Sequence, residues 1–276
     1  MNCCWNDLLA LLPVWLRDQS KELWRESAAE IRLRLDQSPE LVTKSGFHPL
    51  TGTVSREDMA YVINTASRYS PWSAHTMQRG YLTSRGGHRI GICGETIYKN
   101  GDFSGFREIS SLCIRIARDF PGIAGEADMD GSILILGAPG WGKTTLLRDL
   151  IRQRARRQTV CVVDEREELF PCGFRKGTRM DVMTGALKSD GILRLLRTMG
   201  PEVIAVDEIT EPEDCVALRQ AFGCGVKLLA TAHAGSLTEC TAKPMYRKLL
   251  EDDLFDTILV LRRDKTYRKE RWRSCF

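Results

Sequence analysis

A glycine-rich segment that ends in lysine and threonine is the part of this sequence best suited to chemistry. It runs from Gly137 to Thr144 as Gly-Ala-Pro-Gly-Trp-Gly-Lys-Thr, directly after the apolar residues 133–136. Its spacing fits the phosphate-binding loop G-x-x-x-x-G-K-[S/T]. That motif requires an apolar strand before the loop and an amphipathic helix after it, and both are predicted here. The segment therefore predicts a binding site for a nucleoside triphosphate rather than an ordinary glycine-rich turn.

The residue types of this loop have separate functions in such a site. Glycines permit a tight turn whose backbone N–H groups point at an anion, at the start of a helix. Lys143 can reach the β- and γ-phosphates, and the Thr144 hydroxyl can hold Mg²⁺. The predicted nucleotide-binding residues are Gly137, Ala138, Pro139, Gly140, Trp141, Gly142, Lys143, Thr144 and Thr145.

A pair of carboxylates follows a second apolar segment. Asp207 and Glu208 come directly after residues 203–206, which are Val-Ile-Ala-Val. Ligands of open α/β sheets bind at the carboxyl ends of the strands, so both carboxylates are expected beside the phosphate loop. Asp207 would hold Mg²⁺, partly through water, and Glu208 would accept a proton from the attacking water or orient it. The alternative is an acidic pair that merely ends a strand, and the upstream loop favours the catalytic interpretation.

The second carboxylate also separates classes of P-loop protein. A GTPase would carry a glycine shortly after the aspartate and an Asn-Lys-x-Asp segment, and this chain has neither. A small-molecule kinase would leave Glu208 without a clear task. The pair therefore favours an enzyme that hydrolyses ATP, with ATP and Mg²⁺ as its cofactors.

Polar residues end two further predicted strands. Glu165 follows shortly after the apolar residues 160–163, and His233 follows the apolar segment 228–231. Parallel strands end at one edge of a sheet, so both side chains are expected near the γ-phosphate, where a histidine could sense the phosphate or its release. Taken alone, His233 is better explained as the cap of a strand end. Glu165 fits a solvated acidic loop equally well.

Four arginines are candidates to stabilise phosphate charge across a subunit interface. Arg194 and Arg197 lie one turn apart on the helix predicted before the Asp207 strand. Arg115 and Arg118 lie near the end of the first predicted domain. The residue pattern does not choose among these four.

The predicted elements that carry these residues fall into two domains. Residues 1–124 predict an α+β domain, with a helix that begins at Ser55 and a hairpin turn at Asn100-Gly101. Residues 125–276 alternate short apolar strands with helices, which predicts a largely parallel α/β sheet. The strands predicted in this second domain are 132–136, 159–163, 202–206, 226–231 and 256–261, the last paired with residues near Tyr267.

Composition restricts the class of protein further. The chain has 276 residues, of which 43% are hydrophobic, and it has neither an apolar run of membrane-spanning length nor a signal-peptide pattern. Its ten cysteines include no C-x-x-C pair, which favours reduced thiols in a cytoplasmic protein over zinc ligands. The formal net charge of +4 is too small to indicate a nucleic-acid partner.

Several segments of the chain resemble the stage III sporulation protein AA family. The resemblance runs from about residue 25 to about residue 262. That family is similar in turn to the hexameric ATPases of type II and type IV secretion and of pili. The resemblance therefore implies that this chain has a RecA-like P-loop NTPase domain and a smaller N-terminal α+β domain. The segments that carry the resemblance are 86–91, 114–118, 137–144, 163–166, 196–208 and 230–234.

The resemblance also implies roles for single residues. Glu165 falls at the acidic box of the secretion motors, next to the metal and the attacking water. His233 falls at their histidine box, and Glu208 matches their catalytic glutamate. The N-terminal domains of those motors supply arginines to a neighbouring subunit's nucleotide, so Arg115 becomes the preferred arginine finger. One departure is that Thr210 stands where the sporulation family tends to have glycine, and another is that Asp207 replaces the usual glycine of the secretion motors.

A cellular setting follows from the resemblance alone. The resemblance implies an ATPase that self-associates into a hexamer in the cytoplasm of the mother cell of a spore-forming bacterium. There it would lie at the membrane surface, bound to integral membrane proteins of a channel complex. No nucleic-acid partner is expected. One alternative is a nucleic-acid motor or loader of the RecA/AAA+ type, although no segment interleaves basic and aromatic residues. A second alternative is a nucleotide-gated scaffold with negligible turnover.

Overall fold

The chain folds as two compact units. The computed structural model describes residues 2–19, 24–67, 80–125, 130–171 and 173–270. The first unit comprises residues 1–119 together with 171–174, and the second comprises 120–170 and 175–276. Segment 120–125 belongs to the second unit because the Asp149 carboxylate accepts backbone hydrogen bonds from Gly122 at 2.8 Å and from Ala124 at 2.9 Å. The short return of 171–174 to the first unit has no signal in the sequence.

An antiparallel sheet of six strands forms the centre of the first unit, with the strand order β4-β3-β2-β7-β6-β5. In β2 and in the last part of β7, every second residue is apolar and buried, as in Ile31, Leu33, Leu112 and Ile114, because successive side chains of a strand point to opposite faces. In addition, β1 (Asn2–Cys3) pairs with β8 (Arg118–Asp119). The six strands are β2 (Ala28–Arg34), β3 (Glu40–Thr43), β4 (Gly46–Pro49), β5 (Tyr81–Thr83), β6 (Arg89–Lys99) and β7 (Asp102–Arg115).

Helices cover the apolar face of this sheet. Leucines of the N-terminal helices and Met59 and Val62 of α4 lie in one core with strand residues such as Ile114. The predicted helix start at Ser55 is confirmed, because the Ser55 hydroxyl accepts a hydrogen bond from the Asp58 backbone N–H at 3.1 Å and thus caps the helix. Among the described residues, the helices of this unit are α1 (Trp5–Leu11), α2 (Val14–Arg17), α3 (Trp24–Ser27), α4 (Arg56–Ser67) and the 3-10 turn η1 (Arg85–Gly87).

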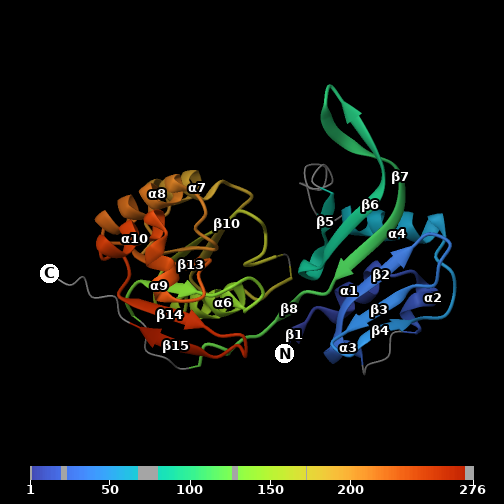
Figure 1. Ribbon diagram of the computed structural model, residues 1–276, viewed down its shortest axis with the longest axis horizontal. Coiled ribbons are helices and arrows are strands. Elements are labelled where there is room, and N and C mark those ends of the chain that lie inside the picture. Colours follow the sequence, from blue (N-terminus) through green and yellow to red (C-terminus); the bar gives the residue numbers. More distant parts are fainter. Residues whose placement is uncertain (1, 20–23, 68–79, 126–129, 172, 271–276) are drawn as a thin grey trace. The chain divides into compact units, whose positions relative to one another are not determined.

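The longest strands of the unit form a hairpin. Asn100 and Gly101 both have positive φ, at 54° and 87°, which is the backbone of the predicted tight turn. The pairing of β6 with β7 continues to Lys99 and Asp102 on either side of that turn. β5 pairs with residues 89–91 of this hairpin and β2 with residues 111–115, and among the described residues no further strand pairs with the rest of it (Figure 1).

His88 is a fully buried histidine that ties segments of this unit together. Its Nδ1 accepts a hydrogen bond from the Ala117 backbone N–H at 3.2 Å, so Nε2 carries the proton and donates to the Cys4 carbonyl at 3.1 Å. Burial lowers the pKa of His88 below its ordinary value, because a charged imidazole would lose its hydration. The folded chain therefore favours the neutral ring.

This neutral histidine predicts a pH dependence of stability. His88 binds a proton more weakly in the folded chain than in the unfolded chain. Its contribution to the free energy of unfolding is therefore fully present above the ordinary histidine pKa and is lost as the pH falls below that pKa. Between about pH 7.5 and about pH 5.5, the loss should be at most about 1.4 kcal/mol per pH unit from this group. Urea denaturation of wild type and His88→Gln, which keeps a donor and an acceptor, measures the difference.

In His88→Gln the free energy of unfolding should change less steeply with pH than in wild type. The exposed control His48→Gln should keep the wild-type slope. Equal slopes in all three proteins would show that His88 does not carry the effect.

The second unit contains a seven-stranded sheet in the order β11-β10-β12-β13-β9-β14-β15. All neighbours are parallel except β14 and β15, which pair antiparallel with Tyr267 opposite Leu261, as predicted. The sequence pattern missed β11, an edge strand of mixed polarity (Met-Asp-Val-Met-Thr). The strands are β9 (Ile133–Leu136), β10 (Val160–Asp164), β11 (Met180–Thr184), β12 (Val203–Val206), β13 (Lys227–Ala232), β14 (Thr257–Leu261) and β15 (Tyr267–Glu270).

Helices lie on both faces of this sheet (Figure 1). The leucines of α6 pack on one face with Ile133 and Ile135, and α7, α8 and α10 pack on the other face with Leu134 and Leu136. Among the residues that the structure describes, no helix combines the length and the apolar character needed to cross a bilayer. The helices are α6 (Lys143–Arg154), α7 (Lys188–Thr198), α8 (Pro212–Gly223), α9 (Leu237–Ala242) and α10 (Pro244–Glu251).

Candidate active site

The candidate site lies at the carboxyl edge of the parallel sheet in the second unit. The phosphate loop follows β9, Asp207 and Glu208 follow β12, and His233 follows β13. Because β13 lies between β9 and β12, His233 stands between the loop and the carboxylate pair. Sequence reasoning placed these residues at one edge. The order of the strands, which decides which of them touch, comes only from the structure.

The predicted nucleotide-binding residues form the connection from β9 to α6. Residues 137–142 make the loop, and Lys143, Thr144 and Thr145 form the first turn of α6. Gly140 and Gly142 have φ values of 75° and 100°, a left-handed backbone that favours glycine, and Gly142 caps the helix. The loop therefore brings backbone N–H groups to a helix N-terminus, where an anion is favoured.

Lys143 lies across this loop. Its Nζ donates hydrogen bonds to the Gly137 carbonyl at 2.8 Å and the Ala138 carbonyl at 3.3 Å. The side chain is buried, and this burial lowers the pKa of Lys143, while the negative charges of Glu208 and Asp207 act in the opposite direction. The ammonium is thus held at the centre of the site by carbonyls and nearby carboxylates.

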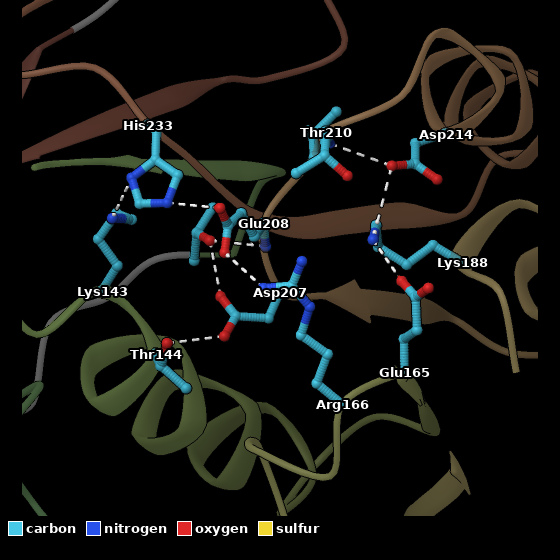
Figure 2. A network of polar contacts seen from close by, with 12 residues as sticks. Lys143, Thr144, Glu165, Arg166, Lys188, Asp207, Glu208, Thr210, Asp214 and His233 are labelled. Carbon is cyan, nitrogen blue, oxygen red and sulfur yellow. Dashed lines mark hydrogen bonds and ion pairs between the residues drawn. The ribbon is translucent and has the colours of Figure 1, made fainter. Parts of the chain in front are cut away.

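His233 connects Lys143 to Glu208, as Figure 2 shows. Lys143 Nζ lies 3.0 Å from His233 Nδ1, and His233 Nε2 lies 2.5 Å from Glu208 Oε1. An ammonium can only donate, so Nδ1 is the acceptor and Nε2 carries the proton that is shared with the Glu208 carboxylate. The imidazole thereby orients the predicted catalytic carboxylate.

Asp207 is held by two hydroxyl groups. The Thr144 hydroxyl donates to Asp207 Oδ2 at 2.7 Å, and the Thr231 hydroxyl donates to Asp207 Oδ1 at 2.7 Å. Thr231 also accepts a hydrogen bond from the Glu208 backbone N–H at 2.8 Å. One buried side chain therefore joins both members of the acidic pair, a connection that has no local signal in the residue pattern.

The backbone of Glu208 is strained. Its φ is 52°, in the left-handed region that residues other than glycine seldom occupy, at a cost of roughly 1 kcal/mol. Hydrogen bonds on both sides maintain this conformation: the Glu208 N–H binds the Thr231 hydroxyl, and the Ile209 N–H binds the Thr231 carbonyl at 2.9 Å. This turn places the Glu208 side chain toward His233.

A cavity lies at the ends of β10 and β12, next to these contacts. Glu165 lines it together with Asp207 and Glu208, so the structure brings Glu165 to the predicted region. The Glu165 carboxylate binds Lys188 Nζ at 2.5 Å. The lining consists of residues 163–166, Glu168, Lys188, Asp207 and Glu208.

Asp164 fixes the loop that follows β10. Its carboxylate accepts hydrogen bonds from the backbone N–H groups of Glu168 at 2.9 Å and Phe170 at 2.8 Å, and from that of Leu169. Burial raises the pKa of Asp164, and these backbone donors oppose the rise. Arg148 of α6 binds the Glu168 carbonyl at 2.7 Å, which ties the loop to the phosphate-loop helix.

The candidate arginines lie in different places. Arg115 is the last residue of β7 in the first unit, largely exposed, with Nε 3.7 Å from Glu30 Oε1. Arg118 lies in β8, Arg194 pairs with Asp190 on α7, and Arg197 is exposed on the same helix. Arg166 was not among the predicted site residues, and its Nη1 lies 3.6 Å from Glu208 Oε2. Its position directly after Glu165 was the available signal.

Replacing Thr231 by valine tests the connection between the two carboxylates. Thr231 is fully buried, and valine has nearly its shape but leaves Asp207 and the Glu208 N–H without this partner. The free energy of unfolding should fall by about 1–3 kcal/mol. Urea denaturation measures it, with Thr231→Ser, which restores the hydroxyl, as the matched control. A valine variant as stable as wild type would contradict this role.

Comparison with known proteins identifies the family. A family model described as "Sporulation stage III, protein AA" matches residues 8–270. Stage III sporulation protein AA of Bacillus subtilis (strain 168) is 34% identical over 282 residues, which cover 94% of this chain and 92% of that protein.

Two solved structures confirm the predicted RecA-like P-loop fold. The ATPase DotB of Legionella pneumophila superposes with a TM-score of 0.58 at 17% identity, over 94% of this chain and 80% of that one. The pilus retraction motor PilT with bound ADP gives a TM-score of 0.59 at 15% identity, over 86% of this chain and 76% of that one. The family predicted from the motifs is confirmed as well, and the chain belongs to the sporulation stage III protein AA family.

Proposed function

We propose that this chain binds ATP with Mg²⁺ and hydrolyses it, as a motor of the secretion-ATPase type. The observation that carries this proposal is the convergence of Lys143, His233 and Glu208 with Thr144 and Asp207 at one edge of a parallel sheet (Figure 2). A phosphate-binding ammonium, a pair of metal-ligand oxygens and a carboxylate base are the parts that phosphoryl transfer to water requires.

The residues present fit a nucleotide with Mg²⁺. The Thr144 hydroxyl and the Asp207 carboxylate are oxygen ligands that lie 2.7 Å apart, as expected for two groups that bind one small hard cation directly or through water. The N-terminus of α6 and the Lys143 ammonium supply the positive field for the phosphates. Bound Mg²⁺ would neutralise charge on the β- and γ-phosphate oxygens.

The chain's own residues would carry the proton. In this proposal Glu208 accepts a proton from the attacking water, and His233 holds the Glu208 carboxylate through Nε2. Lys143 exchanges its contacts with the Gly137 and Ala138 carbonyls for contacts with phosphate oxygens. Because Lys143 also binds His233, a movement of Lys143 toward the phosphates would change the contact between His233 and Glu208.

The assembly and the cellular task rest on the family. We infer that the chain associates into a ring, hexameric as the resemblance implies, and lies in the mother-cell cytoplasm, peripheral to the membrane. There it would energise a channel to the forespore through integral membrane partners. The relatives support a motor of this kind, since one solved structure is named an ATPase and the other a pilus retraction motor with bound ADP.

Two variants separate nucleotide binding from hydrolysis. Lys143→Ala removes a charged hydrogen-bond donor to the phosphates. Such a bond contributes about 1.5–3 kcal/mol, so ATP binding should weaken at least about tenfold. Glu208→Gln keeps the shape but not the base, so ATP should still bind while turnover falls by about 10²-fold or more. Fluorescent-nucleotide titration and phosphate release measure the two effects.

The exposed controls Lys227→Ala and Glu251→Gln should match wild type in both assays. Unchanged affinity in Lys143→Ala would exclude the phosphate loop as the binding site. Normal hydrolysis by Glu208→Gln would remove that residue from the chemistry.

A mixing experiment tests whether Arg115 acts on a neighbouring subunit's nucleotide. Subunits with Arg115→Ala keep an intact phosphate loop, and subunits with Lys143→Ala keep the arginine, so mixing should restore phosphate release that neither has alone. Mixing Lys143→Ala with Glu208→Gln is the control, because both defects affect the subunit that holds the nucleotide and no rescue is expected. The absence of rescue at every ratio of the first pair would exclude Arg115 as a finger in trans.

A further inference from the structure

Lys188 is a buried cation that joins two segments of the candidate active site. It is the first residue of α7, and its side chain is only 7% exposed. Its Nζ lies 2.5 Å from Glu165 Oε2 and 3.8 Å from Asp214 Oδ2. Figure 2 shows the lysine between these carboxylates, one from the loop after β10 and one from α8.

The position of Lys188 is unfavourable for a lysine in two respects. The N-terminus of a helix carries the positive end of the helix dipole, which disfavours a cation. Burial of an ammonium is unfavourable unless opposite charges and hydrogen bonds compensate it. The preceding residue, Leu187, also gives α7 no side-chain cap. The two carboxylates are what holds the charge there.

Asp214 connects Lys188 to the loop that follows Glu208. Its side chain is 5% exposed, and its Oδ2 accepts hydrogen bonds from the backbone N–H groups of Thr210 at 3.1 Å and Glu211 at 3.2 Å. The bond from Glu211 belongs to the capping box at the start of α8, and the bond from Thr210 extends it by one residue toward Glu208. Asp214 therefore fixes the backbone two residues beyond the strained Glu208, and Lys188 supplies the charge that balances it.

Lys188 also lines the cavity that Glu165, Asp207 and Glu208 share. The other cation of that lining is Arg166, whose side chain is 57% exposed and thus screened by water. Lys188 is the buried counter-charge of this acidic cavity, and it binds Glu165 directly.

We propose that Lys188 is a positioning residue for ATP hydrolysis. It fixes the Glu165 carboxylate and the loop after Glu208 relative to each other, so that both carboxylates face one attacking water. In this role Lys188 acts through Glu165 and Asp214, and not on the phosphates or the metal. The inference rests on the proposed function, and it predicts that loss of Lys188 lowers turnover while ATP still binds.

Turnover and affinity are measured together for Lys188→Met, Lys188→Arg and the exposed control Lys227→Met. A misplaced catalytic group lowers the rate by up to about 10²-fold, so kcat of Lys188→Met should fall about tenfold or more. Its affinity for ATP should change by less than about threefold, because the phosphate loop is intact. Lys188→Arg, which keeps the charge, should recover much of the rate. In a Glu165→Gln background, adding Lys188→Met should cost far less than it does alone, because the two residues act as one unit.

Full turnover by Lys188→Met would overturn the proposal, and so would equal loss of affinity and rate in both Lys188 variants.

Amide hydrogen exchange supplies a measurement that does not depend on hydrolysis. Lys188→Met should raise exchange at Thr210 and Glu211 and in residues 165–168, and leave the phosphate-loop helix α6 unchanged. Unchanged exchange in both segments would overturn the positioning role even if wild type proves inactive. A wild type that binds ATP but releases no phosphate would contradict the proposed function alone, because the exchange result would still decide the inference about Lys188.

Discussion

The Thr231 hydroxyl is the contact on which the rest of the candidate site depends. It donates to Asp207 and accepts from the Glu208 backbone N–H, so it orients the predicted metal ligand and maintains the left-handed turn of the predicted base. It can do so because β13 pairs directly with β12, and β9 pairs with the other side of β13. That order also places His233, at the end of β13, within reach of both Lys143 and Glu208.

Charge balance sets a second constraint at this sheet edge. Asp164, Glu165, Asp207 and Glu208 are four of the five acidic residues that line one small cavity, and their ionised carboxylates would destabilise the fold if they had no partners. Each has a distinct partner: backbone N–H groups for Asp164, Lys188 for Glu165, hydroxyls for Asp207, and His233 with Arg166 for Glu208. Because the partners come from different elements, a shift of one element changes the charge environment of the whole site.

Local sequence signals predicted much of the fold and most of the candidate site. Apolar runs gave the strands of the parallel sheet, and the residues that follow each run were expected at one edge, where they are found. Strand order and long-range pairing have no local signal, so the bridge through His233 and the joint role of Thr231 could not be predicted. Lys188 was missed for the same reason, since its partners lie 23 and 26 residues away along the chain, and β11 was missed because an edge strand lacks a continuous apolar run.

The decisive measurement is molar mass by light scattering, with and without ATP and Mg²⁺, together with a phosphate-release assay on the same sample. An assembling ATPase should form a ring-sized particle in the presence of nucleotide, and its phosphate release should rise with the fraction of assembled protein. ATP binding and assembly without any phosphate release would contradict the claim that this sheet edge is an active site.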